Sequence, residues 1–184
     1  MCDFILNENE KQLLLQIARN AIKGLFNEGM KSRSETEIPD KLKAPLGAFV
    51  SLYNETQLRG CIGTFITSKA LFATVEDVAI SSAINDSRFE PVRASEVDDL
   101  TIEISVLTPL ERIKSIDEIE LGVHGIYVKK GILSGTFLPQ VALKTNWTIE
   151  EFLGHCSRDK AGIGWYGWKD AELFRYRAIV FNDK

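Results

Sequence analysis

Apolar residues recur at the roughly 3.6-residue spacing of a helix in two parts of the chain. The first run reaches about Asn27. Asn7 precedes it, and Glu10 stands three residues after Asn7, which is the spacing of a capping box. The second run predicts a helix over about 69–85, before a loop in which Pro91 prevents the helix from continuing. The residues expected to face the core are Leu14, Ile17, Ala18, Ala21 and Leu25 in the first helix and Leu71, Val75, Val78, Ala79 and Ala83 in the second.

Other segments alternate apolar and polar residues, which is the period of a half-buried strand. Strands are predicted over 46–53, 58–66, 101–107 and 172–181, the last with Phe174, Tyr176, Ala178 and Val180 on one face. A hairpin is expected over 125–129 and 132–137, turned at Lys130-Gly131. A short helix fits 148–157, with Thr148 as N-cap and Glu151 at the capping-box position.

The connections between these elements indicate the fold class. Residues 30–45 are polar and contain Pro39 and Pro45, which predicts a long ordered loop of the kind that can wall a cleft. A polar turn over 54–57 makes the two strands on either side of it antiparallel neighbours. Hairpin strands separated by helices favour an α+β fold, an antiparallel β-sheet packed with helices. No repeat or clear linker divides the chain, so residues 1–184 are predicted to form one domain.

Composition narrows the protein class. The chain has 184 residues, and no stretch approaches the ~20 apolar residues of a membrane span. The start, Met1-Cys2-Asp3-Phe4, lacks the pattern of a signal peptide, which predicts a cytoplasmic protein. Three sparse cysteines argue against a disulfide framework, and their spacing suggests no structural zinc site. A net charge of −4 gives no overall electrostatic footprint for nucleic acid, although a local basic patch stays open.

The run Leu58-Arg59-Gly60-Cys61-Ile62-Gly63-Thr64-Phe65 combines a cation, a thiol and two glycines within a predicted strand. Glycine inside a strand usually marks a bulge or a place where another backbone or a ligand comes close. Cys61 stands between the glycines, and Arg59 lies two residues away on the same strand face. This run is therefore the first candidate for a functional site.

The same run resembles the signature of the AMMECR domain family. Four further blocks resemble the family's pattern in order: Asp86-Ser87-Arg88-Phe89 with Pro91, Gly122-Val123-His124-Gly125-Ile126, Leu138-Pro139-Gln140-Val141-Ala142 with Trp147, and Phe152-Leu153 with Cys156 and Lys160-Ala161-Gly162. Their order and spacing hold from about residue 10 to residue 181. One departure is the stretch from Gly164 to Trp168, which is richer in aromatic residues than the family's pattern.

The resemblance implies an α+β fold with a larger antiparallel-sheet domain and a smaller subdomain that meet at a cleft. It also implies an intracellular protein. Prokaryotic family members are associated with a Memo-like protein and a radical SAM protein, so these are the expected partners. The resemblance implies no single activity, since regulatory roles in transcription, repair and translation have all been proposed for the family.

Two residues are candidates for catalysis. Cys61 suits a nucleophile or redox thiol, because a nearby cation favours the reactive thiolate; the alternative is a small buried hydrophobic residue. His124 lies between two glycines and suits a general base, or else a histidine that fixes its loop by hydrogen bonds. By contrast, Cys156 is expected to be structural and His155 to lie at the surface.

A second group of residues is expected to bind a ligand. Arg59, Arg88 and Lys160 come from separate blocks, and converging cations bind carboxylate or phosphate, arginine in a bidentate fork. The alternative is structural ion pairing, for example of Arg88 with Asp86. The full set of predicted binding residues is Arg59, Gly60, Gly63, Thr64, Arg88, Gln140 and Lys160.

These residues lead to two spatial predictions and two function classes. Arg59 and Cys61 are expected at the mouth of a cleft between the main sheet and the C-terminal part of the chain. Arg88, His124, Gln140 and Lys160 are expected to converge there. The site then belongs either to an enzyme or modification-competent protein that binds an anionic small molecule, or to a non-catalytic binding module. No nucleotide-binding loop or serine nucleophile elbow is present, no metal site is expected, and no cofactor is indicated.

Overall fold

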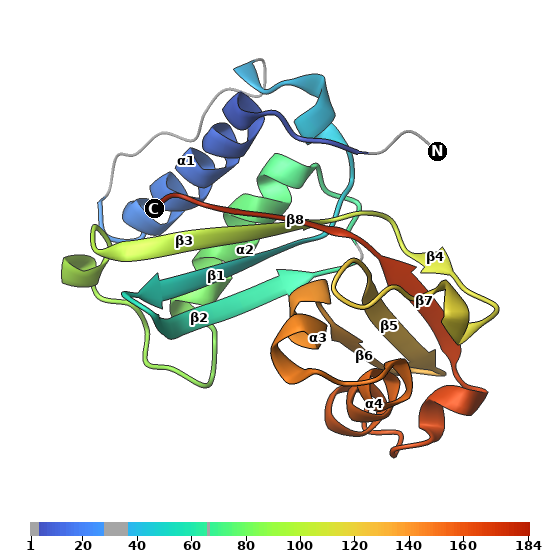
Figure 1. Ribbon diagram of the computed structural model, residues 1–184. Helices are drawn as coiled ribbons and strands as arrows, with labels where there is room; N and C mark the ends of the chain where they lie inside the picture. Colours follow the sequence, from blue (N-terminus) through green and yellow to red (C-terminus); the bar gives the residue numbers. More distant parts are fainter. Residues whose placement is uncertain (1–3, 28–36, 66) are drawn as a thin grey trace. The chain divides into compact units, whose positions relative to one another are not determined.

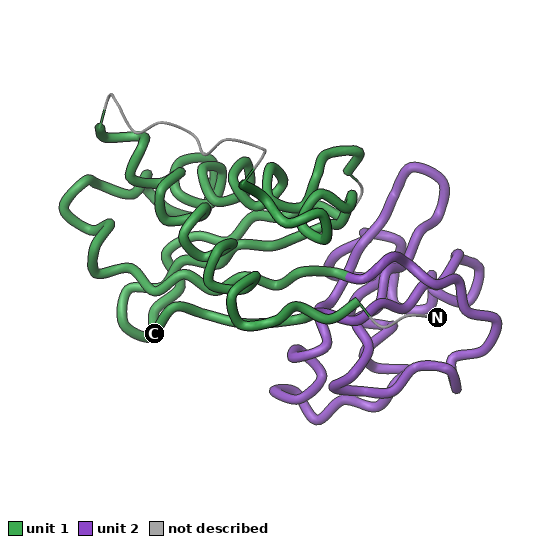
Figure 2. The backbone as a smooth tube through the Cα atoms, turned by 90° about the horizontal axis from the view of Figure 1, so that it is seen from above, with its two compact units in different colours: residues 1–107, 179–184 green, residues 108–178 purple. Residues whose placement is uncertain are grey.

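The computed structural model describes residues 4–27, 37–65 and 67–184. The chain divides into two compact units (Figure 2). The first unit consists of residues 1–107 together with 179–184, and the second unit consists of residues 108–178. The second unit is therefore an insertion into the chain of the first. Within the described ranges, no helix is long and apolar enough to cross a membrane.

A four-stranded antiparallel sheet with two helices on one face forms the first unit (Figure 1). Its strand order is β2-β1-β3-β8. The elements are the helices α1 (Glu8–Gly24) and α2 (Leu71–Ile84) and the strands β1 (Ala48–Asn54), β2 (Gln57–Thr64), β3 (Leu100–Leu107) and β8 (Ala178–Asn182). Short 3-10 turns, η2 (Asp40–Lys43) and η3 (Ala94–Glu96), complete it. The predicted α+β class is confirmed.

The core of the first unit is formed by the alternating positions of the strands and by the helically spaced apolar positions of α1 and α2. Along β1 the even-numbered positions Ala48, Val50 and Leu52 are buried, and the odd-numbered positions between them point to the other face of the sheet. The predicted apolar stripe of α2 is fully buried against this face. In α1 the buried apolar positions are Leu14, Leu15, Ala18 and Ile22, while Ile17 and Leu25 pack at the margin of the core.

Helix α1 begins as predicted. The side chain of Asn7 accepts a hydrogen bond from the Glu10 amide at 2.9 Å, and the Glu10 carboxylate accepts one from the Asn7 amide at 2.8 Å. This capping box satisfies two of the amides that a helix N-terminus leaves without partners. Lys41 also reaches the Glu10 carboxylate, at 3.0 Å. The polar stretch 30–45 contains η2 in its second half, and residues 28–36 lie outside the described part of the chain.

The second unit has its own four-stranded antiparallel sheet, with the order β4-β7-β5-β6. Its strands are β4 (Glu111–Arg112), β5 (Gly125–Lys130), β6 (Leu133–Phe137) and β7 (Glu172–Tyr176). Its helices are α3 (Pro139–Thr145) and α4 (Ile149–His155), followed by a π-helical turn, η5 (Cys156–Lys160), with the 3-10 turns η4 (Ile116–Glu118) and η6 (Gly167–Asp170). The capping box of Thr148 and Glu151 at α4 is confirmed.

The prediction of one strand over 172–181 is wrong. The segment is two strands, β7 and β8, separated by Arg177 and belonging to different sheets. Tyr176 is buried in the second unit, whereas Ile179 and Phe181 pack against the core of the first. The predicted face of Phe174, Tyr176, Ala178 and Val180 is therefore not continuous, and Val180 is 41% exposed.

Candidate functional site

The two glycines of the 58–65 motif are explained by close packing within the first unit. A Cβ atom on Gly60 would lie 2.1 Å from the backbone oxygen of Ser82 in α2. A Cβ atom on Gly63 would lie 2.3 Å from the ring of Phe49 on the neighbouring strand. A register shift between Leu52 and Tyr53 marks a bulge beside Gly60. Both features that strand glycines predict, a bulge and a close backbone, are thus present.

Ser82 also joins the two strands through its side chain. Its hydroxyl accepts a hydrogen bond from the Ile62 amide at 2.8 Å and donates one to the Val50 carbonyl at 2.8 Å. Val50 and Ile62 are directly opposed in the sheet. A helix residue therefore bridges β1 and β2, and it does so because Gly60 lets the helix backbone come close.

Cys61 lies on the sheet face away from the helices. It is paired with Ser51 across β1 and β2, and the Ser51 hydroxyl donates to the Cys61 sulfur at 3.2 Å. Tyr53 and Glu103 share this face by strand alternation. Burial and the nearby Glu103 carboxylate raise the pKa of Tyr53. The Cys61 side chain is half-buried, so it is neither sealed in a core nor fully open.

Asp86 ties the loop after α2 to the outer edge of β2. Its carboxylate accepts a hydrogen bond from the Cys61 amide at 2.8 Å and two from the Arg88 guanidinium, at 2.9 and 2.7 Å. The Arg88 side chain, followed by the Cys61 and Arg88 amides, holds the pKa of this buried carboxyl well below its usual range. Asp86 therefore stays ionised and works as a structural anchor, not as a general acid.

The Arg88 guanidinium is hydrogen-bonded through Nε and Nη2, whereas Nη1 is available to a ligand. Its Nε and Nη2 atoms bind Asp86, and Nη2 also donates to the Cys61 carbonyl at 3.1 Å. The side chain is 57% exposed, and across residues 4–27, 37–65 and 67–184 its Nη1 atom has no hydrogen-bond partner. The structural pairing with Asp86, weighed above as an alternative, is thus present, and it leaves donors of Arg88 directed away from the carboxylate.

Arg59 makes protein contacts with every guanidinium nitrogen. Nε and Nη2 bind the two oxygens of Glu96 at 2.9 and 3.1 Å, and Nη1 and Nη2 donate to the carbonyls of Glu90 and Pro91. The Arg59 side chain is 17% exposed, and its hydrogen bonds lower the pKa of Glu96. Arg59 therefore holds the 90–96 segment against β2, and Arg88 is the better placed of the two to meet an anion.

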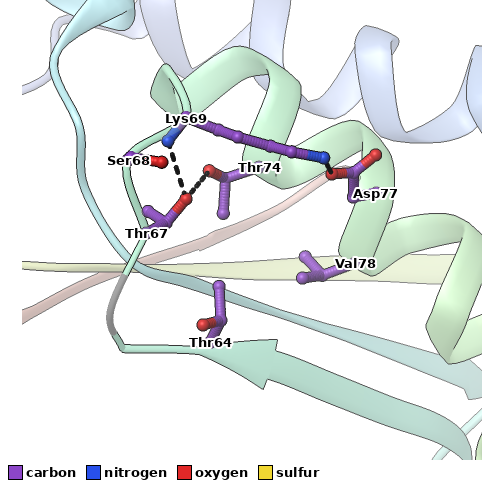
Figure 3. A pocket seen from close by; sticks show the side chains of 7 residues that line it. All are labelled: Thr64, Thr67, Ser68, Lys69, Thr74, Asp77 and Val78. Atoms are coloured by element: carbon purple, nitrogen blue, oxygen red, sulfur yellow. Dashed lines mark hydrogen bonds and ion pairs between the residues drawn. The ribbon is translucent and has the colours of Figure 1, made fainter.

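Thr64, also predicted to bind a ligand, belongs to a different place. It is opposite Ala48 on the helix side of the sheet, and it lines a pocket of about 340 Å³ (Figure 3). Thr67 and Thr74 face each other there, 3.4 Å apart, and the Lys69 side chain runs to Asp77, with which it forms an ion pair. The structure thus separates Thr64 from Cys61 by the thickness of the sheet.

His124 lies in the second unit and is buried, with 7% of its surface exposed. Its Nδ1 atom accepts a hydrogen bond from the Glu120 amide at 3.0 Å, so the ring holds its own loop closed. Burial and then the charges of Arg175 and Arg177 lower the pKa of His124, which keeps the imidazole neutral near pH 7. The loop-fixing interaction is present, and the role of general base stays a prediction.

The other predicted residues of the second unit lie on its helical segments. Gln140 is half-buried in the first turn of α3. Lys160 ends the π-helical turn, with its Nζ atom 5.7 Å from the centre of the Phe137 ring. Because Arg88 belongs to the first unit, the convergence of Arg88 with His124, Gln140 and Lys160 stays a prediction.

Cys156 has the burial expected of a structural cysteine, whereas His155 is less exposed than the surface histidine that the sequence predicted. Cys156 is fully buried, and burial raises the pKa of its thiol to about 12, as suits a structural residue. His155 was expected at the surface, but its ring stacks on Trp147 at 3.9 Å and meets the edge of Trp165. Only 23% of its side chain is exposed. In the described ranges, no three acidic, histidine or cysteine side chains group as metal ligands.

Comparison with known proteins gives the family. The AMMECR1 family model matches residues 15–181. Protein MK0488 of Methanopyrus kandleri is 37% identical, over 97% of this chain and 91% of its own length. Protein PH0010 of Pyrococcus horikoshii is 36% identical, over 98% of this chain and 93% of its own. The crystal structure of that uncharacterized protein superimposes with a TM-score of 0.87, covering 97% of this chain and 94% of the other. The chain belongs to the AMMECR1 family.

Proposed function

We propose that the Cys61 face of the first-unit sheet binds an anionic group through Arg88 and presents a thiol beside it. The observation that carries the proposal is the fixed guanidinium: Asp86 holds Nε and Nη2, while Nη1 is open. A guanidinium held in place loses little conformational freedom when it binds an anion. The chemistry that follows from the thiol is nucleophilic or redox chemistry on a bound anionic molecule.

The surroundings of Cys61 support this function. Ser51 donates a hydrogen bond to the sulfur, and Arg88 donates to the carbonyl of the same residue. The hydrogen bond from Ser51 fixes the sulfur, and the Arg88 guanidinium is fixed at the backbone of the same residue, so a bound anionic molecule would meet both groups. We place this activity in the cytoplasm, in a modification pathway that includes a Memo-like protein and a radical SAM protein.

Paired alkylating reagents test the proposal directly. Iodoacetate and iodoacetamide react with a thiol in the same way, but only iodoacetate carries a negative charge. Peptide mass spectrometry then follows Cys61, Cys2 and Cys156 separately. The rate ratio is the rate with iodoacetate divided by the rate with iodoacetamide. This ratio should be higher at Cys61 than for free glutathione, because Arg88 attracts the anionic reagent. Cys156 should react only after unfolding, since its thiol is buried and protonated.

Variants of Arg88 decide whether it is the cause. Arg88→Gln should reduce the rate ratio at Cys61 to that of free glutathione, and Arg88→Lys should keep part of it. The control is Arg158→Gln, which removes a 52%-exposed arginine of the second unit and should change nothing. An unchanged ratio in Arg88→Gln contradicts anion binding by Arg88. A native protein in which Cys61 does not react contradicts the role of the thiol.

A non-catalytic binding module for a partner protein or nucleic acid is the second candidate. It is favoured by the hydrogen bonds that commit Arg59 and Asp86 to the protein's own loops. In that case Cys61→Ser should leave partner capture intact. Affinity capture of the whole chain with Memo-like and radical SAM proteins from one organism, with and without Cys61→Ser, separates the two candidates.

A further inference from the structure

A small pocket in the second unit lies where β4, the edge strand of its sheet, meets η6. Its volume is about 240 Å³. Ile113, Ile116 and Leu173 supply apolar wall, and the ring of Trp168 closes one side. Pockets for drug-sized ligands hold about 300–1,000 Å³, so the occupant of this one is smaller.

The rim of the pocket is positive. Arg112, Lys114 and Lys169 line it with a single carboxylate, Glu172, which gives a formal net charge of +2. Glu172 lies 3.4 Å from Arg112 and neutralises that side chain. Lys114 and Lys169 form no ion pair with any carboxylate of the described residues. The Glu118 carboxylate is close enough to Lys114 for that charge to help lower the Glu118 pKa, but it forms no direct ion pair with it. Among the described residues, the two ammonium groups at the rim are therefore not tied up in direct ion pairs.

Lys169 is held over the pocket by aromatic rings. Its Nζ atom lies 5.4 Å from the centre of the Trp168 ring and 5.2 Å from that of Tyr166. Cation–π contacts of this kind fix an ammonium without neutralising it, so its charge stays available. Trp168 itself is only 8% exposed and belongs to the apolar core. An apolar wall beside the cations strengthens their attraction for an anion, because it excludes water.

We infer that this pocket binds a small anion with a phosphate group, either free phosphate or the phosphate of a small monoester. Two ammonium groups match the charge of a phosphate dianion, and lysine binds phosphate as a point charge. The apolar wall suits a short carbon body attached to the phosphate. All the lining residues of this pocket belong to the second unit, and none of them is a residue of the Cys61 face.

Calorimetric titration of the whole chain tests the inference, with inorganic phosphate and phenyl phosphate as probes. Both should bind saturably in the millimolar range or better. Lys114→Ala and Lys169→Ala should each weaken binding roughly tenfold, the effect of losing one charge-assisted hydrogen bond. The matched control is Lys144→Ala, which removes an exposed lysine of the same unit outside the pocket and should leave affinity unchanged. Tighter binding of phenyl phosphate identifies a monoester as the ligand, and equal binding identifies free phosphate.

A substitution of Glu172 should raise the affinity for phosphate, the opposite of the effect of the lysine substitutions. Glu172→Gln removes the one carboxylate of the pocket and releases Arg112, so phosphate should bind several-fold more tightly. A purely structural role of these residues would not produce tighter binding. The inference is overturned by an absence of saturable binding, by equal weakening in Lys144→Ala, or by weaker binding in Glu172→Gln. Thermal melting of each variant shows that it is folded before it is titrated.

Discussion

Replacement of Gly60 by alanine tests how β2 and α2 fit together. The added Cβ atom would lie 2.1 Å from the Ser82 backbone oxygen, whereas Cβ atoms essentially never approach a neighbour closer than 3.0 Å. The helix or the strand must therefore move by about 1 Å. The obstacle is main chain, so no side-chain rotation relieves it.

The expected loss of stability is about 2–4 kcal/mol. Overpacking a close contact costs about 1–3 kcal/mol, occasionally more. Any shift of α2 also disturbs the Ser82 bridge between Ile62 and Val50, and each such hydrogen bond contributes about 1 kcal/mol. The lower flexibility of alanine in the unfolded chain returns about 0.4–1 kcal/mol. Urea unfolding followed by circular dichroism measures the difference.

Two further variants make this test specific. Gly24→Ala, at the end of α1, places its Cβ in open space and should leave stability unchanged or raise it by up to about 1 kcal/mol. Ser82→Ala removes the bridging hydroxyl but keeps the carbonyl that obstructs the new Cβ, so it should not rescue Gly60→Ala. If Gly60→Ala unfolds within about 0.5 kcal/mol of the original protein, the scale of ordinary surface substitutions, the described packing is refuted.

Three other variants and one control probe other side-chain contacts. Asp86→Asn should cost about 1–3 kcal/mol at pH 7. Because the pKa of Asp86 is lowered, its stabilisation is complete above about pH 4 and is lost as the pH falls through the lowered pKa, so the variant and the original protein should converge in acid melts. Tyr176→Phe removes the hydroxyl that donates to the Phe137 carbonyl at 3.0 Å and should cost about 1–3 kcal/mol; equal melting would contradict that bond. Arg59→Met should destabilise by a similar amount in urea unfolding, while Lys43→Ala, which breaks an exposed ion pair, should cost under about 1 kcal/mol.

Much of the fold was predictable because local rules decide it. The capping boxes at Asn7 and Thr148 use residues three apart, and the apolar stripe of α2 depends only on helical spacing. The crossing at Arg177 was missed for a physical reason. The alternation of apolar and polar residues shows which residues face the two sides of a sheet. It does not show whether the chain stays in one sheet or passes from one sheet to another.

The contacts of the candidate site residues depend on the fold more than on local sequence. The sequence pointed to Cys61 and Arg88, but the anchoring of both by Asp86 depends on a contact between positions 25 residues apart. Ser51 and Tyr53 were missed, although they are the outward positions of a strand whose inward positions are apolar. For Arg59 the sequence left ligand binding and structural ion pairing open, because its partners Glu90, Pro91 and Glu96 approach only when the chain folds back.

The crossing at Arg177 has a consequence for how the protein is made. Strand β3 ends at Leu107, yet its outer neighbour β8 begins only at Ala178. On the ribosome, the first sheet therefore stands with three strands and an open edge until the entire inserted unit has been synthesised. Strand β8 then completes that edge, and Asp183 forms an ion pair with Arg19 of α1 at 2.5 Å. Until β8 is in place, or if residues 178–182 are deleted, β3 has an unpaired edge, the kind of surface through which chains aggregate.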